Sequence, residues 1–412
     1  MNGRQSVLSL RLVVSTVAAS VAIASPSKSA ESAPPVPFPS EIFQDSKSWD
    51  SPAFKTLWKP QSSPSHLSHR TFPGRPAFFG HHPHAVTALF EGDQITSISI
   101  LFLDSGTWYG YVPKSARDNA RTKQDQFDLL YERILQDVTG GLEKLTGEDG
   151  DETVIGKEAL LRHDALIYKN EDISLRLVTE PGHLIKLILF RSADAARNLR
   201  DPRIANMSSR EKADFFISRV RKNDNGDVTL AEVPVFPQGS RAYCGVSTLA
   251  MATQYLGLRL ETEELAAASG IRYGSTAGSK IKEIYLAAGE EADSRLSRST
   301  SFDFDSARKT IDAGLPVIVW RKFTFERNYV HETFPKRFAN DPAATLPEPD
   351  ESDRATWPND QTGGNHASLI TGYNSDRREV IFTESWGEFA RDRRMRIEEM
   401  EGTAYYAFYP RP

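Results

Sequence analysis

Apolar and polar positions alternate along the first half of the chain in a way that predicts strands. Residues 85–92 (AVTALFEG) and 94–104 (QITSISILFLD) indicate two strands joined by a tight turn. Three more strands are expected in the segments DALIYKN, DISLRLVTE and HLIKLILFRS. Between these groups, residues 125–145 carry apolar side chains at helical spacing, interrupted at Gly140-Gly141. We therefore expect a small α+β domain over residues 76–222.

The composition of the chain changes near residue 223, where a second domain is expected to begin. A capped helix in 208–222 (SSREKADFFISRVRK) leads into the hairpin-turn sequence NDNGD. Residues 244–257 (CGVSTLAMATQYLG) place apolar side chains on one helical stripe, and Gly257 ends that helix. The stretch 223–412 is long enough to form a domain of its own.

A second strand pair is expected near the C-terminus, in residues 363–388 (GGNHASLITGYNSDRREVIFTESWGE). HASLITGY and VIFTES indicate the two strands, and NSDRRE the turn that joins them. Folding about this turn brings His366 within a pair or two of Glu384. A titratable ring and a carboxylate are therefore expected to meet by strand pairing.

Charge narrows the classes of partner that this chain can have. Fifty basic and fifty-five acidic residues give a formal net charge of −5 over 412 residues. The chain thus lacks the excess of basic residues that is typical of nucleic-acid-binding proteins. It also has no polybasic run that would bind an anionic membrane surface. We therefore predict no nucleic-acid partner, and the oligomeric state stays open.

The first 24 residues have the features of a signal peptide. Arg4 and Arg11 accompany an apolar run at 12–24 (LVVSTVAASVAIA) that is too short to cross a bilayer and ends in a small-residue cleavage pattern. Residues 25–75 are rich in proline and serine and are expected to form an arm or tether. We predict a periplasmic or extracellular protein with no membrane span after removal of the signal.

Cys244 is the only cysteine of the chain, and it stands at the start of a predicted helix. Exported proteins commonly use cysteines in pairs, so a single thiol is either a buried filler or a reactive group. Free N–H groups and the helix dipole at a helix start stabilise a thiolate. Gln238 precedes it in a loop and could stabilise an oxyanion. His366 could act as the base, and Glu384 could orient that histidine.

Other polar clusters have simpler interpretations. GHHPH (80–84) contains a proline that breaks any helical ligand face, so a loop is favoured over a metal site. His331 is a competing base, but no paired strand with an acid follows it closely. We predict neither a metal nor a cofactor. Residues 331–364 are expected to form a long loop without regular structure, and its acidic part, 341–360, to line or cover the cleft.

The motifs together resemble those of the papain superfamily of cysteine peptidases. The shared features are QGS-x-x-x-C before a helix, then H-x-x-L-x-x-G-Y, then S-W-G. CGVSTLAMATQYLG and GLPVIVW are most similar to its bacteriocin-leader-processing branch, the thirty-ninth cysteine-peptidase family, and its stand-alone bacterial relatives. The resemblance covers about 228–410. It implies an α+β fold in which a helix bearing the cysteine packs on an antiparallel sheet bearing the histidine.

By this resemblance, Gln238 is the oxyanion donor, Cys244 the nucleophile and His366 the base. The third member is usually Asn or Asp, and here that position holds Glu384. The implied activity is hydrolysis of peptide bonds in a peptide or protein substrate. Two alternatives stay open, a non-catalytic papain-like binding module and an exported amidase or transpeptidase that acts on cell-wall peptides.

Overall fold

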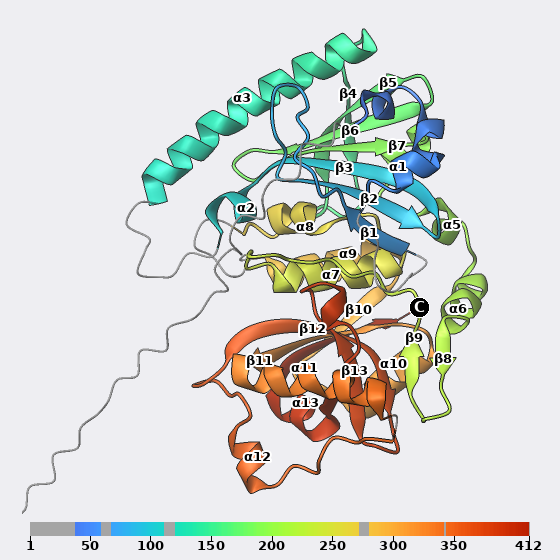
Figure 1. Ribbon diagram of the computed structural model, residues 1–412, viewed down its shortest axis with the longest axis vertical. Helices are drawn as coiled ribbons and strands as arrows, with labels where there is room; N and C mark the ends of the chain where they lie inside the picture. The colour runs from blue at the N-terminus through green and yellow to red at the C-terminus, as the bar shows by residue number, and fades with distance from the viewer. Residues whose placement is uncertain (1–37, 59–66, 111–119, 272–279, 342, 412) are drawn as a thin grey trace, which may run out of the picture.

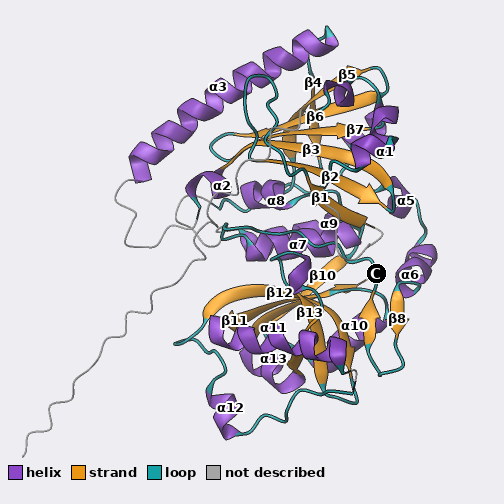
Figure 2. Ribbon diagram, in the orientation of Figure 1, coloured by secondary structure: helices purple, strands orange, loops and turns teal. Residues whose placement is uncertain are grey.

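Two antiparallel sheets form the framework of the protein, and helices lie between them (Figures 1 and 2). The computed structural model describes residues 38–58, 67–110, 120–271, 280–341 and 343–411. The predicted signal peptide and the first part of the predicted arm lie outside these residues. Among the described residues, no helix has both the length and the apolar character needed to cross a bilayer.

The N-terminal sheet has the strand order β1-β2-β3-β7-β6-β5-β4, and all its neighbours are antiparallel. The predicted strand pair is confirmed, because β2 and β3 are joined by a tight turn and pair along their length. The sheet consists of β1 (Leu67–Thr71), β2 (Ala85–Glu91), β3 (Gln94–Asp104), β4 (Asp151–Ile155), β5 (His163–Asn170), β6 (Ile173–Glu180) and β7 (Leu184–Phe190).

The C-terminal sheet has the order β10-β15-β11-β12-β13-β14, and the hairpin β8-β9 joins it through β12. The turn between β8 and β9 is the predicted NDNGD turn. The strands are β8 (Val220–Lys222), β9 (Val228–Leu230), β10 (Arg295–Ser299), β11 (Val317–Phe323), β12 (Gly364–Asn374), β13 (Glu379–Thr383), β14 (Arg393–Arg396) and β15 (Ala404–Arg411).

Helices cover both sheets and fill the space between them. In Figure 1, α3 lies across the outer side of the N-terminal sheet, and α7, α8 and α9 lie between the sheets. The helices are α1 (Pro52–Lys55), α2 (Ser105–Tyr109), α3 (Ala120–Thr146), α4 (Ala193–Arg197), α5 (Pro202–Ala205), α6 (Ser209–Ile217), α7 (Cys244–Tyr255), α8 (Thr262–Ala268), α9 (Ile281–Glu291), α10 (Phe304–Asp312), α11 (Phe325–Asn340), α12 (Glu351–Ala355) and α13 (Ile397–Thr403).

The prediction of an arm over residues 25–75 is wrong for the described part of that segment. Trp49 is fully buried in the core of the N-terminal region, and Phe54 and Trp58 pack beside it. Residues 67–71 form the edge strand β1. Proline and serine content alone suggested a tether, but large aromatic side chains between the prolines supply enough apolar area to fold against the sheet.

Two other expectations from the sequence are corrected. The Gly140-Gly141 pair does not interrupt α3, which runs through both residues. Gly141 instead makes room for the Phe79 ring, since a Cβ there would be 2.2 Å from that ring. The stretch 331–364 is not a structureless loop, since it holds most of α11 and all of α12.

Candidate active site

The thiol of Cys244 lies at the first residue of α7, as predicted from the sequence. The helix is buried on every side from Val246 to Tyr255, more completely than a single stripe predicts. It packs against the C-terminal sheet, and the hydroxyl of Thr248 donates to the carbonyl of Ala367 on β12, at 3.2 Å. Buried packing therefore fixes the helix start, and with it the thiol, against the strand that carries His366.

His366 and Glu384 meet across neighbouring strands, which confirms the predicted hairpin. β12 and β13 pair antiparallel with Leu369 opposite Thr383, so Glu384 follows at the end of its strand. His366 Nε2 lies 2.7 Å from Glu384 Oε2. The imidazole is also hydrogen-bonded to Cys244. Since Nε2 is taken by the carboxylate, Nδ1 is the ring atom left for the thiol.

Two residues that the sequence analysis missed hold the second oxygen of the carboxylate. Arg321 on β11 donates to Glu384 Oε1 at 2.7 Å, and Ser368 Oγ donates to the same oxygen at 2.9 Å. The Arg321 Nε atom also donates to Ser368 Oγ, at 2.9 Å. A buried carboxylate is costly unless it is paired and hydrogen-bonded. Glu384, at 0% exposure, meets both conditions.

The charges of this group shift three pKa values, and each shift favours the charged form of the side chain. Burial alone lowers the pKa of His366, but Glu384 and Cys244 outweigh burial and raise it to about 9. Burial raises the pKa of Cys244, but the hydrogen bond and the charge of His366 outweigh it and lower that pKa below the ordinary thiol value. The carboxyl pKa of Glu384 falls to about 2, against burial, because His366 and Arg321 lie beside it. Together these shifts favour a thiolate, an imidazolium and a carboxylate at neutral pH.

Aromatic rings enclose the imidazole. Trp386 stacks on His366 with ring centroids 4.9 Å apart, and Phe323 lies 5.0 Å from the same ring. Trp386 belongs to the S-W-G motif, so its contact with the histidine gives that motif a physical role. The rings limit the access of water, which strengthens the charge interactions around His366.

A cavity of about 400 Å³ opens beside the thiol. Its lining includes Cys244 and His366 and the apolar side chains Ile271, Trp320 and Tyr405. None of its lining residues comes from 341–360, so the expectation that this acidic stretch lines the cleft is not met. The stretch instead contacts α11, where Asp353 pairs with Arg327 at 2.6 Å, and β14, where Arg396 Nε donates to the Pro347 carbonyl at 3.1 Å.

Gln238 is held by the residue that follows Glu384. Its backbone N–H donates to the Ser385 carbonyl at 2.8 Å, and its Oε1 accepts from Ser385 Oγ at 2.7 Å. The amide Nε2 donates to the carbonyl of Arg241 at 3.0 Å, which leaves a second N–H on the same nitrogen. The loop before α7 is therefore tied to the strand end that carries the carboxylate.

The competing base, His331, belongs to a separate group. It lies on α11, with Nε2 2.9 Å from Glu399 Oε1, and burial lowers its pKa. Glu399 also accepts from Arg327 at 2.6 Å. His331, Glu399 and Arg327 therefore form a histidine, carboxylate and arginine group like that of His366, Glu384 and Arg321, but without a thiol beside the histidine. In the described ranges, no cluster of three or more His, Cys, Asp or Glu side chains could hold a metal ion.

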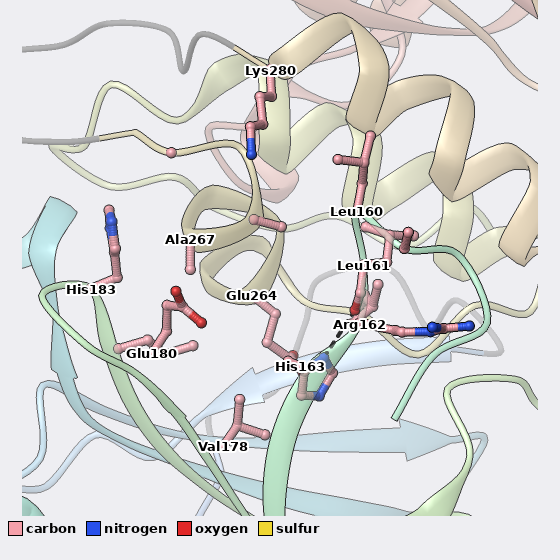
Figure 3. Close-up of a pocket in the computed structure, with 15 residues that line it drawn as sticks. Leu160, Leu161, Arg162, His163, Val178, Glu180, His183, Glu264, Ala267 and Lys280 are labelled. Carbon is pink, nitrogen blue, oxygen red and sulfur yellow. Dashed lines mark hydrogen bonds between the residues drawn. The ribbon is translucent and has the colours of Figure 1, made fainter. Parts of the chain in front are cut away.

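A larger cavity, of about 560 Å³, lies between the N-terminal sheet and α8 (Figure 3). Glu264 and Ala267 of α8 line it together with His163 and Val178 of the sheet. Cys244 is not among its lining residues. The cavity therefore occupies one part of the junction between the two regions, away from the thiol.

Comparison with known proteins agrees with the geometry of the C-terminal region. Residues 230–410 match the profile of the Peptidase_C39 like family. A solved C39-like peptidase structure from Bacillus anthracis is 17% identical, covers 45% of this chain and 98% of its own, and superposes with a TM-score of 0.29. No curated protein matches the sequence. The C-terminal region of this chain, residues 230–410, is therefore similar to the Peptidase_C39 like family, as its sequence motifs indicated.

Proposed function

We propose that this protein is an exported cysteine peptidase in which Cys244 attacks the carbonyl of a peptide bond. The observation that carries the proposal is the continuous contact from Cys244 through His366 to Glu384. A nucleophile, a base bonded to it and an orienting group bonded to the base are the parts that acyl transfer requires. Export is supported by the apolar run at 12–24, and the destination is the periplasm or the extracellular space.

The reaction follows from the charges of the group. The Cys244 sulfur adds to the carbonyl carbon, and the oxyanion accepts from the Gln238 amide and the Cys244 backbone N–H. The C–N bond then breaks, and His366 gives its proton to the leaving nitrogen. Water next attacks the thioester and gives a proton to the imidazole, and the sulfur leaves as thiolate. Glu384 holds the ring in place and stabilises its charged form.

The same acyl-enzyme would serve an amidase or a transpeptidase, which differ in the leaving group or in the second nucleophile. Hydrolysis of peptide bonds is favoured by the family of residues 230–410. The apolar wall beside the thiol, formed by Ile271, Ile281 and Trp320, supports a substrate with an apolar side chain near the scissile bond.

Labelling with a thiol-directed peptidyl inhibitor tests the proposal. The wild-type protein should gain the mass of one inhibitor and cleave a peptide library, and Cys244→Ala should do neither. Alkylation should already be rapid below pH 7. A rate that rises only near about pH 8.5, the ordinary thiol value, together with no peptide turnover, would favour the non-catalytic binding module.

A further inference from the structure

The loop that carries Gln238 and leads into Cys244 is held from the N-terminal region. Tyr243, the residue before the thiol, is 2% exposed. Its hydroxyl donates to Asp104 Oδ1 at 2.9 Å and accepts from the backbone N–H of Gly106 at 3.0 Å. Asp104 ends β3 and Gly106 lies in α2, so both belong to the first half of the chain. A contact across 137 residues of sequence thus fixes the residue next to the nucleophile.

Gly106 gives Tyr243 the space that this contact needs. A Cβ at Gly106 would stand 2.2 Å from both Cζ and the hydroxyl oxygen of Tyr243, a separation that real Cβ atoms do not show. The neighbouring Asp104 is equally constrained, because its Oδ2 accepts from the backbone and the hydroxyl of Thr107, both at 2.7 Å. The tyrosine ring therefore fits a preformed site and cannot shift without losing both bonds.

A second link reaches the same loop through α8. The Arg241 guanidinium donates from Nε to the Gln238 carbonyl at 2.8 Å and from Nη1 to Glu263 at 2.5 Å. Lys186 on β7, with 1% of its side chain exposed, lies 3.6 Å from the same Glu263. A path of charged contacts thus runs from the N-terminal sheet to the residue proposed as the oxyanion donor.

We propose that Asp104 and Gly106 are positioning residues of the active site, and that the N-terminal region serves to hold the 237–244 loop. This inference rests on the proposed function, because the loop matters most if Gln238 and Cys244 perform acyl transfer. It assigns the N-terminal region a role in catalysis through Tyr243 and Arg241, without contact with the substrate.

Gly106→Ala in the full chain tests the inference, with Gly140→Ala as the matched control. Gly140 also lies in a helix of the N-terminal region, and a Cβ there meets nothing within 4 Å. Removing an oxyanion donor outright costs about 10²–10³ in kcat, so displacing the loop by Gly106→Ala should lower kcat roughly tenfold, with KM nearly unchanged. The pH midpoint of Cys244 alkylation should rise toward about 8.5. Gly140→Ala should match wild type in both.

A second variant separates positioning from loss of fold. Tyr243→Phe removes only the hydroxyl, and should lower kcat in the same direction while the protein stays folded by circular dichroism. Both variants act on one contact, so the double variant should lose no more than the larger single loss. Independent, multiplying losses would overturn the inference, as would a kcat for Gly106→Ala equal to that of Gly140→Ala. If the wild-type protein cleaves no peptide, the proposed function fails. The positioning role is then tested by alkylation alone, and an unchanged pH midpoint of Cys244 alkylation in Gly106→Ala would refute it.

Discussion

Replacing Glu384 by glutamine should disconnect the imidazole from its charge partner while preserving the size of the side chain. In the native protein the carboxylate bonds His366 at 2.7 Å and also accepts from Arg321 and Ser368. A glutamine keeps one oxygen for these donors but carries no charge. Burial then becomes the dominant influence on the histidine, and burial favours the neutral ring.

The size of the effect follows from the pKa of His366. The native value of about 9 lies about 2.5 above the ordinary 6.5, and one pKa unit corresponds to about 1.36 kcal/mol, so the surroundings favour the imidazolium by about 3 kcal/mol. Without the carboxylate, only Cys244 still raises this pKa against burial, so the preference should shrink and the pKa should fall. A larger share of the rings would then be neutral at pH 7, and the thiol would lose much of the cation that stabilises its thiolate.

Alkylation of Cys244 by iodoacetamide across pH 5–10 measures this directly, with peptide turnover as the second assay. The midpoint should move upward in Glu384→Gln, and turnover should fall but stay measurable. Glu399→Gln is the matched control, because it removes a buried carboxylate from a His and an Arg in the same way but away from the thiol. If Glu384→Gln shows the wild-type midpoint and turnover, the assignment of Glu384 as the orienting group is wrong.

Four further outcomes are expected. Cys244→Ala and His366→Ala should abolish peptide turnover, and circular dichroism should show both folded. The unfolding free energy should fall as the pH rises through about 9, because the pKa of His366 is higher in the folded protein than its unfolded value of 6.5. The stabilisation from His366 is complete only below pH 6.5. Urea titrations between pH 6 and 10 check this, and His366→Gln should remove most of the change. Trp320→Ala should lower kcat/KM for apolar peptides roughly tenfold, the scale of a changed hydrophobic subsite, with polar peptides as the comparison. Deleting residues 341–360 should lower the melting temperature without changing peptide preference, since this stretch packs on α11 and β14 and not beside the thiol.

Local patterns predicted the parts of the site that depend on one element or one hairpin. The helical pattern predicted that Cys244 stands at the start of a helix, and the alternation on both sides of a short turn predicted that His366 lies near Glu384. The structure confirms both predictions. Arg321 could not be found in this way. It stands in a strand of mostly apolar residues, and only the pairing of β11 with β12 brings it to the carboxylate. Which strands become neighbours depends on packing between distant segments.

The fold of the N-terminal half was predicted less completely, for a similar reason. Alternating strands and a long amphipathic helix were visible, but residues 38–58 were assigned to a tether because stretches rich in proline and serine flank them on both sides. Trp49 and its aromatic neighbours become core residues only when the sheet supplies a surface for them. Likewise, nothing near Gly106 indicates a partner, since Tyr243 lies far along the sequence.

One apolar core continues from the N-terminal sheet into the helices that carry the thiol. Ile167 and Ile188 of that sheet belong to the same buried cluster as Leu249 of α7 and Ile284 of α9. Separating the two halves would expose this surface to water, so heating should produce a single calorimetric transition instead of two. A propeptide that is cut and released must leave a folded enzyme behind. The N-terminal half shares its interior with residues 230–410, so its removal would open that shared apolar surface to water, and it lacks the separable character of such a propeptide.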